Sequence, residues 1–492
     1  MQHGLLIGGG TTQVHLNPRY ANRHGLIAGA TGTGKTVTLQ VLAEAFSSIG
    51  VPVFMADVKG DLSGLCTAAK PHSKIDERIE KIGIDDYQSE AFPVAFWDLF
   101  GEQGIPVRTS ISEMGPQLLA SLMDLNETQE SILTLAFQYA DDEGLLLVDL
   151  NDLRTTLQYI ADHGKELGSQ LNVSKASVNA ILRRLLMIER DGGHHFFGEP
   201  ALDLKDFRRT DRSGRGIINI LCADKLMHSP RIYSTFLLWM LSDLFQSLPE
   251  LGDPEQPELV FFFDEAHLLF NSAPKVLVNK IEQLVRLIRS KGVGVYFITQ
   301  SPADLPDSVL AQLGNRIQHA LRAYTPNERR AVNVAAQSFR TNPDINTVEA
   351  ISNLGIGEAL VSVLSDGGVP TPVERVLICP PRSRIGPSDD DHKTAQLIAD
   401  PLLRRYKESY DPHSAHEEIE ARLRNAEDLK RQEALKAQEA KEAQTAQSNQ
   451  RPAARGRTRE TASEAMMKSL ARSIGSGVGR RLIRGVLGSL MK

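Results

Sequence analysis

The sequence is poor in cysteine and carries no excess of positive charge. Its three cysteines, Cys66, Cys222 and Cys379, are an odd number for disulfides and lack the paired spacing of a zinc site. We therefore expect buried thiols in a reducing compartment, which predicts a cytoplasmic protein. The formal net charge of -6 excludes a surface that is basic throughout, so any nucleic acid must contact a local patch or a channel.

Signals for export and for membrane insertion are also missing from the sequence. Residues 1–10 lack the basic start, apolar core and cleavage site of a secretory signal. No uninterrupted apolar run is long enough to span a bilayer. With 492 residues, 41% of them hydrophobic and 24% charged, the chain has an ordinary globular composition and exceeds the size of one hydrophobic core. We expect two or three domains with appendages.

A glycine-rich stretch dominates what is present. Residues 29–36 read Gly-Ala-Thr-Gly-Thr-Gly-Lys-Thr directly after a short apolar strand, which is the pattern of a phosphate-binding loop. The glycines allow successive N–H groups to turn toward phosphate oxygens, Lys35 supplies charge for the β and γ phosphates, and the following helix directs its positive end at the anion. The predicted nucleotide-binding residues are Gly29, Ala30, Thr31, Gly32, Thr33, Gly34, Lys35, Thr36 and Val37.

A second polar group follows a strand that contains no polar residue. The apolar run 259–263 reads as a central strand buried on both faces and ends in Asp264 and Glu265. We predict that Asp264 and the Thr36 hydroxyl hold Mg²⁺, and that Glu265 is the general base for an attacking water. Gln300, after the strand 292–299, is predicted to sense the γ-phosphate; closing a turn is its alternative role.

The strand 51–56 also ends in polar residues, Asp57-Val58-Lys59-Gly60-Asp61. Polar residues just past the carboxyl end of a parallel strand lie on the edge where open α/β sheets bind ligands. A plain surface turn fits the same residues equally well. Both interpretations stay open at the level of the sequence.

Composition and periodicity divide the chain into five segments. The C-terminal one carries apolar residues at every fourth position from Met466 to Leu490 with basic residues between them, which predicts a basic amphipathic helix. Docking on protein, contact of residues 465–492 with a membrane surface, and binding of nucleic acid are its alternative roles. The segments are the start of a P-loop ATPase core (1–64), a mainly helical insertion (65–215), the rest of the core (216–380), a linker with a charged helix (381–450), and a basic linker with the amphipathic helix (451–492).

Three motifs together resemble the HerA/FtsK superfamily of ring-forming DNA motor ATPases. They are the loop at 29–36, the strand end Phe-Phe-Phe-Asp-Glu-Ala-His at 261–267 and the strand end Thr-Gln at 299–300. The stretches 22–25 and 56–61 are similar to the bacterial HerA-like branch. The resemblance covers roughly residues 1–380. It implies an α/β fold: a RecA-like P-loop NTPase core with a mainly parallel sheet, a large helical insertion and a helical C-terminal tail.

The resemblance also implies a function, cofactors and partners. It implies an ATPase that couples hydrolysis of Mg²⁺-bound ATP to movement on DNA as a helicase or translocase, assembled as a homo-hexamer. An arginine of a neighbouring subunit would reach the γ-phosphate, and Arg289 and Arg316 are the candidates.

A nuclease or other protein partner is a further expectation of the resemblance. HerA proteins carry an N-terminal β-barrel associated with partner docking, and this sequence has none before the loop that begins at Gly29, which weakens the expectation of a nuclease. The alternative function is an ATP-driven protein remodeler or scaffold without a nucleic-acid substrate, membrane-associated through residues 465–492.

Overall fold

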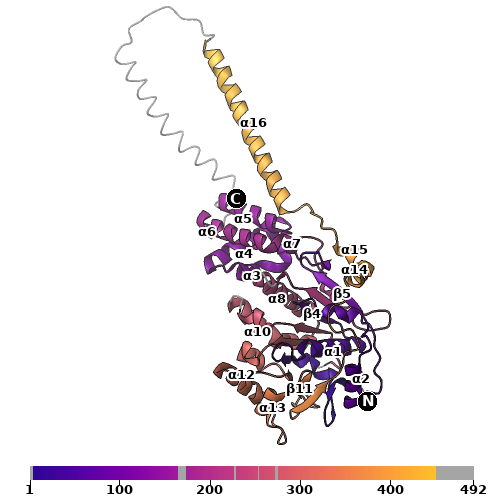
Figure 1. Cartoon of the computed structure of the whole chain (residues 1–492). Coiled ribbons are helices and arrows are strands. Elements are labelled where there is room, and N and C mark those ends of the chain that lie inside the picture. The colour runs from indigo at the N-terminus through magenta and orange to yellow at the C-terminus, as the bar shows by residue number, and fades with distance from the viewer. Residues whose placement is uncertain (1–3, 165–172, 227–228, 253, 272–274, 450–492) are drawn as a thin grey trace, which may run out of the picture. The chain divides into compact units, whose positions relative to one another are not determined.

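The computed structural model describes residues 4–164, 173–226, 229–252, 254–271 and 275–449. The chain forms two compact units, Met1–Ala421 and Arg422–Lys492. The first unit consists of a sheet with helices packed around it (Figure 1). The predicted amphipathic helix of residues 465–492 lies outside the described residues. None of the described helices combines the length and the apolar character needed to cross a membrane.

The first unit is organised by one sheet, which has twelve strands among the described residues. Eight neighbouring strands, from β10 to β6 in the sheet order, run parallel, and four antiparallel strands extend one side. This mainly parallel sheet confirms the predicted fold class. In sheet order the strands are β2 (Gln13–Leu16), β1 (Leu5–Gly9), β12 (Glu374–Ile378), β11 (Glu358–Ser362), β10 (Asn315–Gln318), β3 (Gly25–Ala28), β9 (Val293–Thr299), β8 (Leu259–Phe263), β4 (Val53–Asp57), β7 (Ile218–Cys222), β5 (Val94–Asp98) and β6 (Ile105–Pro106).

The strand register places four polar segments along one edge of the sheet. Ala28 of β3 lies opposite Thr299 of β9, and Phe297 of β9 lies opposite Phe263 of β8. Phe263 in turn lies opposite Ala56 of β4. Because parallel strands end at the same edge, the segments that follow β3, β9, β8 and β4 emerge side by side.

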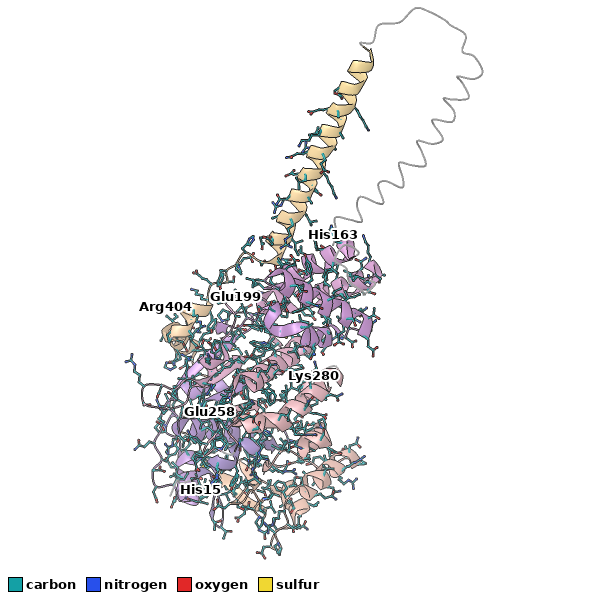
Figure 2. All side chains as sticks on the ribbon, turned by 180° about the vertical axis from the view of Figure 1, so that it is seen from behind. His15, His163, Glu199, Glu258, Lys280 and Arg404 are labelled. Carbon is teal, nitrogen blue, oxygen red and sulfur yellow. The ribbon has the colours of Figure 1, made fainter. Side chains whose placement is uncertain are left out.

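Helices cover the two faces of the sheet through two hydrophobic clusters. The strands β3, β4, β8 and β9 are buried throughout, which explains their continuous apolar sequence. Polar contacts reinforce the packing: Glu258, labelled in Figure 2, precedes β8 and accepts a hydrogen bond from Arg208 Nη2 at 2.6 Å. The helices of this unit include α1 (Lys35–Ser48), α2 (Ser73–Ile82), α8 (Pro230–Ser247), α10 (Lys275–Ile288), α12 (Pro326–Gln337) and α13 (Thr347–Asn353).

The helical insertion is smaller than the sequence predicts. The strands β5 and β6 fall within residues 65–215 but belong to the main sheet, where Trp97 of β5 donates an indole hydrogen bond to Asn219 at 3.0 Å. Helix α2 precedes these strands, and the helices that pack on one another follow them (Figure 1). They are α3 (Ile111–Met123), α4 (Glu127–Glu143), α5 (Leu150–His163) and α6 (Lys175–Ile188).

The predicted linker 381–450 also begins later than expected. Residues up to Ala421 belong to the first compact unit, where they form α14 (Asp390–Ala399), α15 (Pro401–Tyr406) and the start of α16 (Ala415–Asn449). Tyr406 is fully buried and donates its hydroxyl to Asp206 at 2.6 Å. The proline- and glycine-containing segment at 380–387 also docks on the core, where the Ser383 N–H donates to Glu44 at 3.0 Å and the Pro381 carbonyl accepts from the Tyr87 hydroxyl at 2.8 Å.

Candidate active site

The glycine-rich loop is held from both sides by backbone hydrogen bonds. The Gly29 N–H donates to the Thr299 carbonyl at 3.2 Å, and the Ala30 N–H donates to the Ala320 carbonyl at 2.8 Å. A β-carbon on Gly29 would lie 2.5 Å from the β-carbon of His319, which is too close for two carbon atoms. The loop therefore needs glycine at this position in order to pass beside β10.

Lys35 folds over the loop that precedes it. Its ammonium donates to the carbonyls of Gly29 at 2.7 Å and Ala30 at 3.2 Å. Burial lowers the pKa of Lys35, and the carboxylates of Glu265 and Asp264 act against that shift. The lysine starts helix α1, whose N-cap Gly34 has a left-handed backbone with φ of 117°. This places a positive charge and a helix N-terminus at the mouth of the loop.

Asp264 and Glu265 follow the buried strand β8 and differ in their surroundings. Asp264 Oδ1 accepts the Glu265 N–H at 2.9 Å. Burial, with the negative charge of Glu265, raises the pKa of Asp264 to about 6. Glu265 has a φ of 48°, a left-handed conformation that is uncommon for a residue with a β-carbon and is found at functional sites.

The two oxygens of the Glu265 carboxylate have different contacts. Oε1 accepts a hydrogen bond from Lys59 Nζ at 2.8 Å. Oε2 lies 3.4 Å from His267 Nδ1, and neither of these two buried atoms has a hydrogen-bond partner among the residues that the structure describes. Burial raises the pKa of Glu265, but the contact with Lys59 and the charges of His267 and Lys35 outweigh it, so the net shift is downward.

Lys59 is a site residue to which the sequence analysis assigned no role. Asp57 builds the turn beneath it: Oδ1 accepts the N–H groups of Lys59 at 3.2 Å and Gly60 at 2.7 Å, and Oδ2 accepts that of Leu62 at 3.0 Å. Asp57 thus makes the turn that one interpretation of residues 57–61 predicts, and the ligand-binding interpretation stays a prediction, although Lys59 reaches the Glu265 carboxylate. The sequence does offer one signal for Lys59, because this residue lies in the polar segment that directly follows strand β4.

The predicted sensor Gln300 is exposed and directly follows Thr299, whose carbonyl contacts the loop. The turn after it is closed by Asp304, which accepts hydrogen bonds from the Thr299 hydroxyl at 2.7 Å and the Ser301 N–H at 2.9 Å. Gln300 is therefore not needed for the alternative role of closing the turn. Its role toward a γ-phosphate stays a prediction.

The two candidate trans-acting arginines lie at different places in the fold. The Arg316 guanidinium donates to the backbone carbonyls of Leu313 at 3.1 Å, Ser338 at 2.8 Å and Leu310 at 2.9 Å, so it holds the chain around β10 together. Arg289 lies in a 3₁₀ turn before β9, at the sheet edge opposite the loop. A role of either arginine toward a neighbouring subunit stays a prediction.

The site residues fit a magnesium ion. Thr36 offers a hydroxyl at the start of α1, the helix that follows β3 and the loop. Asp264 offers a carboxylate directly after β8, and only β9 lies between β3 and β8 in the sheet. Oxygen ligands of this kind suit Mg²⁺, which uses few protein ligands and completes its shell with phosphate and water. Within the described ranges no group of three or more His, Cys, Asp or Glu residues forms a metal cage of its own.

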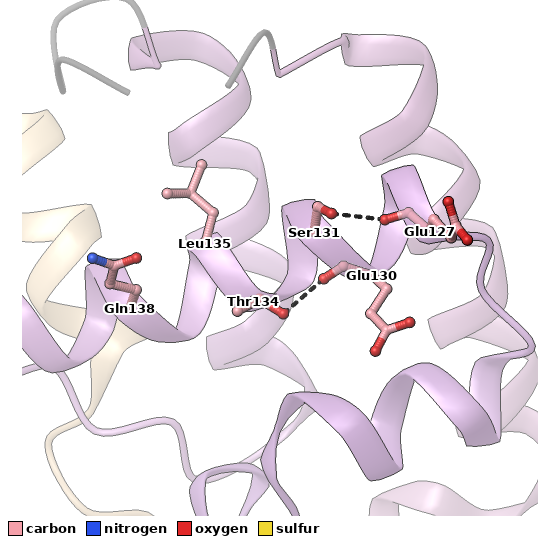
Figure 3. Close-up of a pocket in the computed structure, with 6 residues that line it drawn as sticks. All are labelled: Glu127, Glu130, Ser131, Thr134, Leu135 and Gln138. Carbon is pink, nitrogen blue, oxygen red and sulfur yellow. Dashed lines mark hydrogen bonds between the residues drawn. The ribbon is translucent and has the colours of Figure 1, made fainter. Parts of the chain in front are cut away.

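A cavity of about 440 Å³ adjoins the end of the loop at Gly34 and Val37. Its lining combines apolar side chains with arginines: Ile75, Arg78, Ile356, Pro380, Pro381, Arg384 and Ile385. Arg78 is fixed there by the carbonyls of Gly357 at 3.3 Å and Ile378 at 3.0 Å. The hollow along α4 in Figure 3 is different, because Ser131 and Thr134 bond to carbonyls of their own helix and the hollow does not include the loop.

His319 supports the loop from below and is a second residue that the sequence did not single out. Its Nε2 contacts the Thr38 hydroxyl of α1 at 2.8 Å, and its Nδ1 contacts the Glu358 carbonyl at 2.9 Å. Burial, with the charge of Lys35, lowers the pKa of His319 to about 4. The imidazole is therefore neutral at physiological pH and acts as a spacer between β10, α1 and β11.

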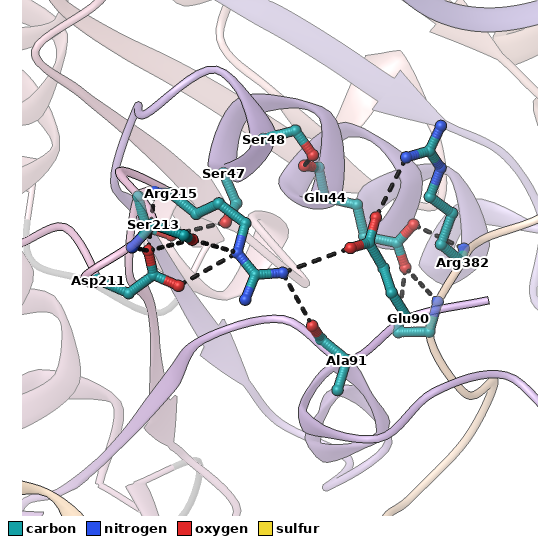
Figure 4. A network of polar contacts seen from close by, with 11 residues as sticks. Glu44, Ser47, Ser48, Glu90, Ala91, Asp211, Ser213, Arg215 and Arg382 are labelled. Carbon is teal, nitrogen blue, oxygen red and sulfur yellow. Dashed lines mark hydrogen bonds and ion pairs between the residues drawn. The ribbon is translucent and has the colours of Figure 1, made fainter. Parts of the chain in front are cut away.

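Helix α1 is further anchored by a polar network around Glu44 (Figure 4). The Glu44 carboxylate accepts the N–H groups of Arg382 at 2.8 Å and Ser383 at 3.0 Å. Glu90 joins the Arg382 guanidinium at 3.1 Å to that of Arg215 at 3.4 Å. Burial raises the pKa of Glu44 to about 7. The segment after β12 is thereby tied to the helix that starts at Lys35.

Comparisons with known proteins agree on one family and one fold. Residues 5–492 match the model of the helicase HerA-like C-terminal family. The chain is 22% identical over 379 residues to the DNA double-strand break repair helicase HerA of Sulfolobus acidocaldarius, covering 73% of this chain and 66% of that protein. The same-named protein of Saccharolobus solfataricus is 23% identical over 367 residues, at 73% and 65% coverage. The chain thus spans about two thirds of the length of these relatives.

Two solved structures share the fold. The plasmid coupling protein TrwB in complex with a non-hydrolysable GTP analogue has a TM-score of 0.52 at 16% identity, over 77% of this chain and 90% of that one. VirB4 of Thermoanaerobacter pseudethanolicus has a TM-score of 0.50 at 14% identity, over 77% and 97%. At these identities the likeness concerns the fold alone.

Proposed function

We propose, from the premise that the chain belongs to the helicase HerA-like C-terminal family, that it is an ATP-hydrolysing ring motor that moves on DNA. One observation carries the catalytic part of this proposal. The loop around Lys35 and the carboxylates of Asp264 and Glu265 emerge along one sheet edge, close enough for both carboxylates to act on the Lys35 charge.

Glu265 Oε2, which has no hydrogen bond among the described residues, supports a role of Glu265 as general base. A buried carboxylate oxygen without a hydrogen bond among the described residues is costly, and a water molecule in line with a γ-phosphate would satisfy it. Glu265 would take the proton of that water as it attacks. When bound, Mg²⁺ held by Thr36 and Asp264 supplies charge stabilisation to the phosphates. Lys35 and the loop N–H groups orient the chain of phosphates.

The cavity beside Gly34 is the proposed place for the nucleotide base. Apolar side chains such as Ile75 and Ile385 provide flat contact area, and Pro380 closes the lining from the segment that Glu44 and Gln40 anchor. Replacing Ile75 with Asp should weaken binding of ATP about 10-fold, because a charge would enter the apolar lining. Unchanged affinity for ATP would show that the nucleotide base does not bind in this cavity.

An exposed basic surface supports DNA as the substrate, and we define the Tyr324 surface as Arg322, Tyr324, Arg329 and Arg330. Tyr324 is 81% exposed, and the three arginines are exposed as well. Glu328 Oε2 fixes the turn by accepting the N–H groups of Tyr324 at 2.9 Å and Thr325 at 2.8 Å. An aromatic ring among arginines suits stacking on a base and contact with phosphates.

The Tyr324 surface is also connected to the nucleotide loop. Ala320, four residues before Tyr324, accepts the Ala30 N–H. A displacement of this surface on DNA binding would therefore be transmitted to the phosphate-binding loop (residues 29–36) through the backbone of residues 320–324. We propose that a homo-hexamer aligns these surfaces and that Arg289 of a neighbour completes each site; assembly would then be required for turnover, and dilution should lower activity per subunit.

The decisive experiment measures ATP turnover with and without duplex DNA at stated salt. We expect stimulation by DNA and a binding affinity that falls steeply with salt. The double variant Arg329→Ala/Arg330→Ala should lose stimulation and reduce the salt dependence, whereas Arg183→Ala/Arg190→Ala, which removes two exposed arginines of the insertion, should not. If DNA leaves the rate of ATP turnover unchanged and no salt-sensitive binding of DNA is found, the proposed DNA motor function is wrong.

A further inference from the structure

Lys59 covers the proposed catalytic carboxylate from the solvent side. Its Nζ lies 2.8 Å from Glu265 Oε1, and its side chain is 48% exposed whereas that of Glu265 is 10% exposed. The contact joins the turn after β4 to the end of β8. Lys59 thus reaches inward to a buried charge, which differs from a surface ion pair between two exposed side chains.

The backbone of Lys59 is fixed while its charged end rests on a flexible stem. Asp57 holds the N–H groups of Lys59, Gly60 and Leu62, so the turn keeps its shape. The four-carbon stem of a lysine allows its ammonium to move several ångströms without any change in that turn. The geometry therefore suits an ammonium that exchanges partners.

Lys35 and Lys59 both interact electrostatically with the same two carboxylates. The charges of Glu265 and Asp264 act on both lysines, and Lys59 acts on Lys35 as well. Lys35 starts helix α1 at the end of the loop, so the Lys59 ammonium lies within electrostatic range of the residue that is proposed to bind the phosphates. A terminal phosphate carries more negative charge than one carboxylate and binds ammonium groups strongly.

We propose that Lys59 is a second phosphate-contacting lysine, which leaves Glu265 Oε1 when ATP binds and contacts the γ-phosphate. This inference rests on the proposed ATPase function and adds a residue that distinguishes ATP from ADP. ADP has no γ-phosphate, so Lys59 stays on Glu265 when ADP is bound. The pair with Glu265 is then the resting state that follows phosphate release.

The test compares the dissociation constants of ATPγS and ADP, in Mg²⁺, for the full chain and its variants. Lys59→Ala should weaken ATPγS about 10- to 100-fold, the size expected for one charge-assisted contact, and change ADP less than about 2-fold. Lys59→Arg keeps a cation and should restore most of the affinity for ATPγS. Lys81→Ala, an exposed lysine on α2, is the matched control and should change neither constant.

A second variant keeps the proposal testable even where Lys59→Ala does not fold. Glu265→Gln removes the carboxylate that competes for Lys59, so it should tighten ATPγS about 2- to 5-fold and leave ADP unchanged. Equal losses of both nucleotides in Lys59→Ala, or an unchanged ratio of the two constants in both variants, would overturn the proposal. Failure of the wild-type chain to bind any nucleotide would instead reject the ATPase function and this inference with it.

Discussion

The phosphate cradle comes from one continuous stretch, residues 29–36, whereas the carboxylate group combines the turn after β4 with the end of β8. In the cradle, the glycine backbone and the lysine that would hold a phosphate are neighbours in sequence. In the carboxylate group, Lys59 and Glu265 meet only because β4 and β8 pair in parallel. Under the proposed function, the first region binds the nucleotide, whereas the second cleaves the bond and contacts the γ-phosphate through Lys59.

Removal of the cradle's charge should have the largest effect. Lys35→Ala takes away the ammonium that now donates to Gly29 and Ala30, and we expect the loss of about 100-fold or more in affinity for both ATP and ADP. Titration with a fluorescent nucleotide measures this, with Lys81→Ala as the control. Retained affinity would show that the carboxylate region also governs binding.

The carboxylate region should affect turnover without loss of binding. Glu265→Gln keeps the size of the side chain but removes the base, so hydrolysis should fall about 10²- to 10⁴-fold. Affinity for ATP should be equal to or tighter than that of the wild type. Steady-state phosphate release and equilibrium binding check the two parts separately.

The shape of the cradle provides a smaller test. Gly29→Ala would place a β-carbon 2.5 Å from that of His319, so the loop must shift, and we expect ATP affinity to fall about 10-fold. Gly32→Ala has open space around the new carbon and bears only the strain of a φ of 79°, so its loss should be smaller. The dissociation constants of ATP for the two variants measure this difference. Equal losses of affinity would contradict the claim that His319 limits the space at Gly29.

The smallest effect concerns the network that anchors α1. The pKa of Glu44 in the folded protein is raised to about 7, so the folded state keeps a proton that an unfolded glutamate loses near pH 4.5. The contribution to stability is present below pH 4.5 and is lost as the pH rises through 7. Glu44→Gln should therefore lessen the fall of Tm between pH 5 and pH 8, whereas the exposed Glu77→Gln should not. An equal fall in all three proteins would contradict the role of this network.

Much of the fold could be predicted because its signals are local. The loop, the apolar strand β8 and the strand β9 each occupy one short stretch, and the structure places them in neighbouring positions of the sheet. The strand β5, Val-Ala-Phe-Trp-Asp, was missed because five buried residues carry neither helical nor alternating periodicity. The segment 381–421 was assigned to a linker because its composition hides the partners, such as Glu44, that hold it.

The parts of the site that escaped prediction are tertiary contacts. The sequence cannot show that Lys59 reaches Glu265, since 206 residues separate them. It also cannot show that the donors of Arg316 are used by three backbone carbonyls or that His319 limits the space at Gly29. Each depends on which strands become neighbours, and that follows only from the folded sheet.

The division between the two regions is tested most directly by measuring bound ATP and released phosphate on the same samples of three proteins. The wild type should bind ATP and release phosphate, Glu265→Gln should bind and release almost none, and Lys35→Ala should do neither. The account would be contradicted by a Glu265→Gln protein that releases phosphate at the wild-type rate, because the base would then lie outside the carboxylate region.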